Sequence, residues 1–216
     1  MITSYKELTI NKYQEIRKII EEDGGELAIQ SKIIAALTGM DVDDVLNLSL
    51  TKYNEYVQKT AFLLEKPKLD GKIPHKLNIN GIECVITKDV NKLTAAQYID
   101  YQTLTAMKDQ EKYLANILAC FIVPKGKKYS DGYDTDEIVQ WIGENLSILD
   151  GLNICFFFRK KYMNSIRLTV TYLELTMKRM SRKAKTPEVK EKMKELNKEL
   201  TTLRRLLQQS GDGLVW

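Results

Sequence analysis

Few side chains in this sequence have the types and the spacing that enzyme chemistry requires. His75 is the only histidine, and it follows Pro74 in a segment rich in Lys, Gly and Asp. General base catalysis needs a side chain that a positioned partner holds in place, and the sequence suggests no Ser-His-Asp or Cys-His arrangement. We therefore expect His75 to lie on the surface, and we predict no catalytic residues and no enzymatic activity.

The run Pro124-Lys-Gly-Lys-Lys128 has the glycine and the lysines of a loop that could hold a phosphate group. A phosphate-binding loop also needs a second glycine at a five-residue spacing before the lysine, and a Ser or Thr directly after it. Both are missing from this run. We predict a solvated basic turn that binds no nucleotide.

Four acidic residues after this turn have side-chain oxygens that could bind Ca²⁺: Asp131, Asp134, Asp136 and Glu137. Calcium loops place Asp at alternating positions and Gly at the sixth, and these residues do not follow that order. Asp134 has a simpler role, because a side-chain oxygen at this position caps the helix that the next residues predict. We expect a helix cap at Asp134 and no metal site.

Cys84, Cys120 and Cys155 lie far apart among Val, Ile, Leu and Phe. Reactive thiolates need a polar, electropositive neighbourhood, and a disulfide framework needs an even number of cysteines. We predict three buried thiols without catalytic, disulfide or metal chemistry. The protein is expected to need no cofactor and to be made in a reducing compartment.

The composition, with 44% hydrophobic and 29% charged residues among 216, is typical of a soluble globular protein of one or two domains. The first residues, Met1 to Glu7, lack the basic and apolar regions of a signal peptide. The sequence contains no run of about 18 apolar residues, the length that could span a membrane. We expect a protein of the cytoplasm in which it is made, without a membrane partner.

The net charge of +4 conceals two oppositely charged parts. From Cys155 to Gln209 the chain carries 15 Lys and Arg against five Glu, so the remainder has a net charge of −6. A basic helical segment could bind nucleic-acid phosphates through release of counterions. Lys alternates with Glu from Glu188 to Glu195, however, which is the usual pattern of a solvated helix face. We therefore expect the basic C-terminal helices to contact protein rather than nucleic acid.

Apolar residues at three- and four-residue spacing predict helices over most of the chain. Thr9 and Asp41 are candidate caps, and Gly39 is a candidate helix end. In the N-terminal helical subdomain, residues 1–66, helices are expected at about 10–20, 27–37, 41–46 and 51–65.

The period changes after a linker that runs from Pro67 to Pro74. Apolar and polar residues then alternate around Asn80-Gly81, a dipeptide favoured in two-residue hairpin turns. We predict one small β-hairpin at about residues 76–87, within a linker and hairpin segment of residues 67–91.

The stretch from Tyr113 to Phe158 is expected to form the core of a central helical domain, residues 92–185. A capping box, Thr94 to Gln97, begins this domain. Further helices are expected from Tyr113 to Ile122, from Asp134 to Asn145 and from Ser147 onward. The last of these is apolar on nearly all sides as far as Phe158, so it must be deeply packed or contact another chain.

The last segment, residues 186–216, is predicted to form a long amphipathic helix and a tail. Its apolar residues recur at alternating four- and three-residue spacing, the heptad pattern of a helix that packs on a partner helix. The candidate partner-binding residues are Val189, Met193, Leu196, Leu200 and Leu203. The predicted fold is therefore mainly α, with one small hairpin and a long C-terminal helix.

Three blocks of the sequence resemble small assembly or virion proteins of tailed phages that infect gut Bacteroides-type hosts. These blocks are Lys92–Gln102, Ile117–Asp134 and Glu144–Leu152. Within that group the chain is most similar to the tail assembly chaperones, over residues 5–170. The resemblance implies a helical, non-enzymatic protein that coats the long apolar tape measure protein until tail tube subunits replace it. It implies no catalytic residues.

Three functional hypotheses remain open. The first is a tail assembly chaperone that binds the tape measure protein in the host cytoplasm. The second is a permanent virion component, such as a connector or tail ring subunit built by symmetric packing of the same helices. Both predict other phage proteins as partners and allow a homo-oligomer. The third is a basic helical nucleic-acid-binding protein, whose affinity would fall steeply with salt.

Overall fold

The computed structural model describes residues 1–74, 76–107, 109–129, 135–181 and 187–211, with side chains as far as Gln208. Within these ranges the chain forms nine α-helices, three short 3-10 helices and one antiparallel sheet of three strands. The mainly α fold expected from the sequence is confirmed. None of the described helices is long and apolar enough to cross a membrane.

The chain divides into two compact units, Met1–Phe156 and Phe157–Trp216. The first unit contains the sheet and most of the helices. The second consists of the rest of the longest helix and the helix that follows it. The four segments expected from the sequence remain a prediction.

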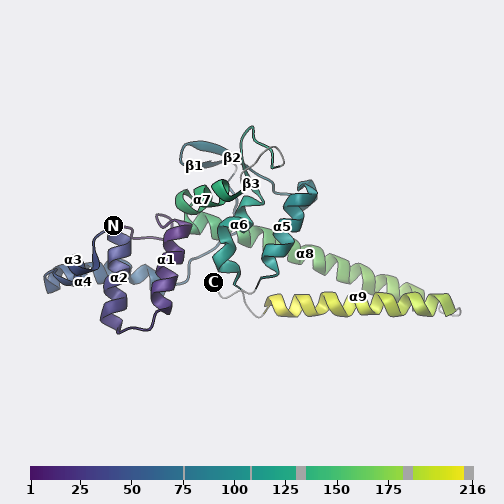
Figure 1. The fold of residues 1–216 in the computed structure, drawn as a ribbon. Coiled ribbons are helices and arrows are strands. Elements are labelled where there is room, and N and C mark those ends of the chain that lie inside the picture. Colours follow the sequence, from purple (N-terminus) through teal and green to yellow (C-terminus); the bar gives the residue numbers. More distant parts are fainter. Residues whose placement is uncertain (75, 108, 130–134, 182–186, 212–216) are drawn as a thin grey trace. The chain divides into compact units, whose positions relative to one another are not determined.

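The first unit opens with a run of helices joined by tight turns. They are α1 (Ile10–Glu21), α2 (Glu26–Thr38), α3 (Val42–Leu46), α4 (Leu50–Thr60) and the 3-10 helix η1 (Ala61–Leu64). Figure 1 shows α1 and α2 side by side and antiparallel. The four helices expected in this part of the chain are confirmed, with ends that differ by a few residues.

Local side-chain chemistry sets several of these helix ends. The Thr9 hydroxyl accepts a hydrogen bond from the Lys12 amide at the start of α1. Gly39 ends α2 in the left-handed conformation that glycine adopts without strain. Asp41 precedes α3 as expected, but its side chain makes no cap hydrogen bond. The sequence therefore predicts the position of α3 correctly and the Asp41 cap bond wrongly.

A backbone pairing joins the N-terminal residues to the start of α8 (Ile148–Ser181). Thr9 and Ser147 form an isolated antiparallel bridge, with backbone hydrogen bonds of 2.7 and 3.2 Å on either side of it. The flanking residues make those hydrogen bonds, and each is at most 3% exposed: Leu8, Ile10, Leu146 and Ile148. The bridge therefore lies inside the apolar core of the first unit, and it begins both α1 and α8.

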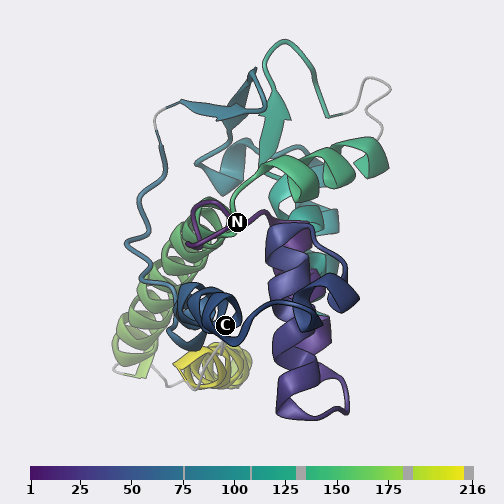
Figure 2. The ribbon, with the colours of Figure 1, turned by 90° about the vertical axis from the view of Figure 1, so that its left-hand side faces the viewer.

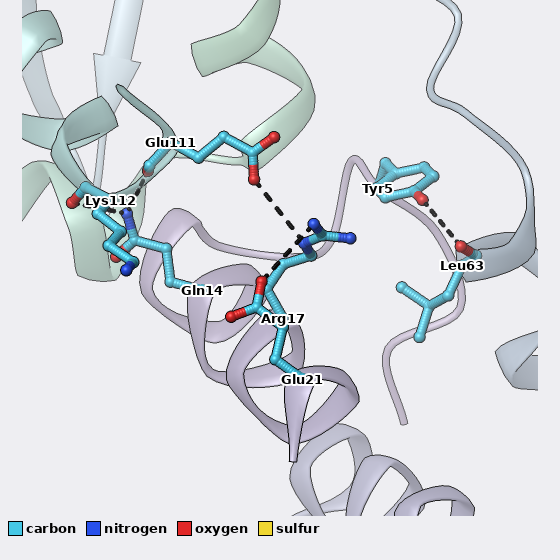
Figure 3. A network of polar contacts seen from close by, with 7 residues as sticks. All are labelled: Tyr5, Gln14, Arg17, Glu21, Leu63, Glu111 and Lys112. Carbon is cyan, nitrogen blue, oxygen red and sulfur yellow. Dashed lines mark hydrogen bonds and ion pairs between the residues drawn. The ribbon is translucent and has the colours of Figure 1, made fainter. Parts of the chain in front are cut away.

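Polar contacts also hold α1 against the 3-10 helix η3 (Gln110–Tyr113), as Figure 3 shows. Gln14 Nε2 donates to the backbone carbonyl of Glu111 over 2.9 Å. The Arg17 guanidinium lies 3.7 Å from the Glu111 carboxylate and 3.8 Å from the Glu21 carboxylate. Ion pairs at the protein surface add little stability by themselves, so the Gln14 contacts contribute alongside them to holding η3 on α1.

Tyr5 ties the N-terminal segment to the end of η1. Its hydroxyl donates to the backbone carbonyl of Glu65 over 2.9 Å. The hydroxyl also lies 3.5 Å from the backbone carbonyl of Leu63, and Figure 3 draws this second contact. Its ring packs edge-on against Phe62, with 5.1 Å between the ring centroids. Burial raises the pKa of Tyr5, which keeps the hydroxyl protonated as a donor.

The small sheet is built on the predicted hairpin. Strands β1 (Leu77–Ile79) and β2 (Ile82–Ile86) pair antiparallel across Asn80-Gly81. Asn80 and Gly81 have positive φ angles of 47° and 82°, as a two-residue turn of this kind requires. The predicted hairpin is therefore confirmed, together with the residues of its turn.

A third strand, β3 (Ile122–Pro124), pairs antiparallel with β2 and corrects one prediction. The helix expected from Tyr113 to Ile122 is shorter, because α6 (Leu114–Ala119) ends before Phe121. The amide of Thr87 donates to the Phe121 carbonyl over 2.9 Å, so this backbone pairs with the hairpin instead of continuing the helix. Figure 2 shows the resulting sheet above α7 (Thr135–Asn145).

Gln97 joins α5 (Ala95–Thr105) to the end of α6. Thr94 and Gln97 form the predicted capping box at the start of α5. Gln97 is also buried, and its Nε2 donates to the backbone carbonyl of Cys120 over 3.0 Å. A single side chain thus begins one helix and satisfies the carbonyl that the next helix leaves free.

The linker predicted from Pro67 to Pro74 contains no helix or strand, but it is bound to the first turns of α8. The Asn153 Oδ1 atom accepts hydrogen bonds of 3.0 Å from the amides of both Asp70 and Gly71. A Cβ atom on Gly71 would lie 2.9 Å from the Phe156 ring. Gly71 also has a positive φ of 66°, so both the backbone and the space around it require glycine.

This packing predicts unequal effects of alanine at two glycines with positive φ. Gly126→Ala should destabilise the protein by about 1 to 2 kcal/mol, because its φ of 87° is strained for alanine but nothing lies within 4 Å of the new methyl. Gly71→Ala should lose roughly 1 to 3 kcal/mol more, because the methyl overlaps Phe156. Urea denaturation followed by circular dichroism measures both. Equal losses would contradict the packing of the linker on α8.

Candidate interaction surface

The second unit is a pair of antiparallel helices, made by α8 after Phe156 and by α9 (Pro187–Gly211), as Figure 1 shows. Pro187 is the first residue of α9, as the sequence predicts, because proline is tolerated at this position. The two helices share a buried core of Ile166, Val170, Leu173 and Leu200. Partly buried side chains pack around it: Met163, Met177, Leu196, Leu203 and Leu207. We call this pair of helices the helical hairpin.

The structure places the predicted heptad residues of α9 against the same chain. Leu200 is 4% exposed, and Leu196 and Leu203 pack on the same core. Val189 and Met193 are half-buried. The partner helix that the heptad pattern requires is therefore α8 for at least three of the five residues. Binding of another protein by these five residues remains a prediction.

A second row of apolar side chains runs along α8, and within the described part of the second unit no helix covers it. Leu168, Tyr172 and Leu175 are 72, 67 and 52% exposed, respectively. They recur at four- and three-residue spacing, so they share one helix face. Two residues along a helix correspond to about 200° around its axis, so this row lies opposite the core residues Ile166 and Val170. We call these three residues the outer stripe.

Sequence reasoning missed the outer stripe because the apolar row toward α9 dominates the pattern of α8. The signal was nevertheless present, since two rows with the same spacing occur on α8, offset by two residues. One row can pack on the neighbouring helix of a two-helix hairpin, and the other cannot.

Basic side chains dominate the charge around the outer stripe. From Phe157 to Trp216 the chain has 15 basic and six acidic residues, a net charge of +9. Lys178 and Arg179 follow the stripe on α8 and are exposed. Glu174 is engaged with α9, because Arg204 lies 2.6 Å from its carboxylate. The outer stripe is therefore an apolar surface in a positive field, suited to a helix that carries both apolar and acidic residues.

A group of titratable side chains lies in the first unit, where α5 approaches the end of α6. The Tyr129 hydroxyl donates to the Asp100 carboxylate over 2.8 Å. Burial raises the pKa of the Cys120 thiol to about 12, and the negative charge of Asp100 adds to that rise. Burial and this hydrogen bond also raise the pKa of Tyr129. These shifts keep thiol and phenol protonated at neutral pH, which disfavours nucleophilic catalysis.

The other residues considered for chemistry form no site within the described part of the chain. No cluster of three or more metal-ligating side chains occurs among the described residues. The Asp134 cap and the position of His75 lie outside them, as does Asp131. Lys125, in the basic turn, is paired with Glu83 of β2 at 2.7 Å.

Comparison with known proteins finds no matching family model, no matching curated protein and no matching solved structure.

The burial of Leu200 predicts a large effect of its truncation on the helical hairpin. Leu200→Ala should lower the free energy of unfolding by about 2 to 5 kcal/mol, because it leaves a cavity between α8 and α9. Leu206→Ala is the matched control on the same helix, since Leu206 is 39% exposed, and it should cost less than about 1 kcal/mol. Urea denaturation of both variants, followed by helical circular dichroism, gives the comparison. Equal losses would show that α9 does not pack through Leu200.

The raised pKa of Cys120 predicts slow thiol chemistry in the folded protein. With a pKa of about 12, only about one Cys120 thiol in ten thousand is ionised at pH 8, because each pH unit below the pKa lowers the thiolate fraction tenfold. Labelling with a disulfide reagent at pH 8, followed by peptide mass spectrometry, should leave Cys120 unmodified until urea unfolds the protein. Rapid labelling of Cys120 in the native protein would disprove this burial.

Proposed function

We propose that this protein is a non-enzymatic assembly protein of a tailed phage, a tail assembly chaperone that binds the tape measure protein in the host cytoplasm. The observation that carries the proposal is the exposed outer stripe of α8, Leu168, Tyr172 and Leu175. The resemblance of three sequence blocks to such chaperones supports the phage setting. The protonated thiol and phenol groups favour binding over catalysis.

The outer stripe has the chemistry that capture of a helix requires. An amphipathic helix binds an apolar surface through residues at three- and four-residue spacing, and the outer stripe repeats that spacing. Covering apolar surface contributes about 25 cal/mol per Å², and the basic residues near the stripe favour acidic partners. The half-buried residues Val189 and Met193 offer further apolar surface on α9.

The proposal predicts that polar substitutions on the outer stripe abolish capture of the tape measure protein. The variant Leu168→Ser, Tyr172→Ser, Leu175→Ser should bring down at least tenfold less co-expressed tape measure protein than the wild type, because it removes the apolar contact. A matched control, Leu27→Ser with Leu64→Ser, changes exposed leucines of the first unit and should leave capture unchanged. Affinity capture with quantitative mass spectrometry measures both. Unchanged capture by the stripe variant would refute the proposal.

A connector or tail ring subunit is the second candidate function. Besides the outer stripe, the first unit has an exposed apolar surface around α3. This second surface favours a ring subunit, because head-to-tail packing of identical subunits needs two different surfaces on each copy. Mass spectrometry of purified particles separates the candidates. A chaperone would be missing from mature particles, whereas a ring subunit would be present in stoichiometric amounts.

A further inference from the structure

We propose that copies of this chain associate head to tail, with the exposed edge of α3 in one copy bound to the outer stripe of α8 in the next. The proposal rests on the proposed function in one respect, since it uses the same outer stripe as a binding surface. It names a different occupant, a second copy of this chain. The α3 edge and the outer stripe are both apolar, have the same residue spacing and carry opposite charge.

The α3 edge carries apolar side chains that the first unit leaves uncovered. Val42 and Leu46 on α3 are 36 and 53% exposed, and Leu50, four residues later at the start of α4, is 75% exposed. Val45, three residues after Val42, is fully buried against Ile34 and Ala35 of α2. Val45 thus anchors α3 on the first unit, while the exposed parts of Val42, Leu46 and Leu50 are available to another chain.

The charge of the α3 edge is opposite to that of the outer stripe. Asp41, Asp43 and Asp44 are exposed beside Val42 and Leu46. From Met1 to Phe156 the chain has 18 basic and 23 acidic residues, a net charge of −5, against +9 for the remainder. Contact between two helical hairpins would bring like charges together, whereas contact of α3 with a helical hairpin pairs opposite charges.

The two surfaces also match in length. Val42 and Leu46 are spaced four residues apart, as Leu168 and Tyr172 are, so one apolar pair can cover the other. The outer stripe from Leu168 to Leu175 is roughly 11 Å long at 1.5 Å per residue, and the five residues of α3 span about 7.5 Å, after which Leu50 extends the apolar edge. Lys178 and Arg179 follow Leu175 on α8, so they place positive charge at the end of the apolar contact, toward which the acidic α3 edge is attracted.

Such a contact joins the α3 edge of one copy to the outer stripe of another. Each copy therefore has one free α3 edge or outer stripe with which it can bind a further copy. Contacts of this kind form rings when the rotation between copies closes and filaments when it does not. A two-fold rotation closes a dimer with two such contacts, and any other rotation gives a larger assembly. The strength of the contact should fall as salt screens the charges.

Charge reversal at either surface tests the proposal with the purified protein alone. The wild type should self-associate in sedimentation velocity and equilibrium runs at low salt, and less at high salt. Two double variants reverse the charge at one surface each. The α3 variant carries Asp43→Lys with Asp44→Lys, and the α8 variant carries Lys178→Glu with Arg179→Glu. Each should dissociate at least tenfold more readily than the wild type, because it places like charges at the contact. An equimolar mixture of the two should associate again, since opposite charges then meet at every contact. Recovery in the mixture also shows that both variants are folded.

A control variant, Lys190→Glu, Lys194→Glu, makes the same change of charge on α9 and should associate like the wild type. A wild type that is monomeric at every concentration would overturn the proposal. So would an α3 variant that associates like the wild type, or a mixture that stays monomeric. Capture of the tape measure protein is measured separately, so a monomer that still captures it would refute self-association and leave the proposed function standing.

Discussion

The pairing of Thr9 with Ser147 is the contact on which the first unit depends. Each hydroxyl also accepts a hydrogen bond from an amide in the first turn of the following helix, so one bridge holds the caps of both α1 and α8. The two helices must therefore begin at the same place, with their first apolar residues facing one core. Gly151 shows how tight this core is, because a Cβ there would lie 3.1 Å from Leu118 and 3.2 Å from Ile10. Shifting either helix start would break both caps.

Features that depend on neighbouring residues could be predicted from the sequence, and features that depend on distant residues could not. The Thr94 capping box, the Asn80-Gly81 turn and the Gly39 helix end each need only a few adjacent residues. Strand β3 was missed because three residues are too few to distinguish a strand from a helix by their spacing. Binding of the linker was missed because Gly71 and its acceptor on α8 are 82 residues apart.

The same distinction explains what the sequence says about the interaction surface. A heptad row shows that a helix needs a partner, but the pattern is the same whether that partner belongs to the same chain or to another. In this protein α8 supplies the partner for Leu196, Leu200 and Leu203, and the apolar surface left over lies on α8 itself. Only the three-dimensional structure separates the two rows of α8, because only there does one row have a covering helix.

The size of the outer stripe indicates how it can work. Fully burying a large apolar side chain contributes about 1.5 to 3 kcal/mol. The three residues are 72, 67 and 52% exposed, so covering what is still exposed contributes roughly 3 to 6 kcal/mol. Association itself costs an estimated 4 to 15 kcal/mol, so a single contact of this size is weak. Weak contacts become effective when many are linked, because linked sites bind at high effective concentration. A long helical partner, or a row of identical copies, supplies such linkage, and a compact single partner does not. The stripe is therefore suited to contacts that repeat along an extended partner, each of them weak enough to exchange by itself.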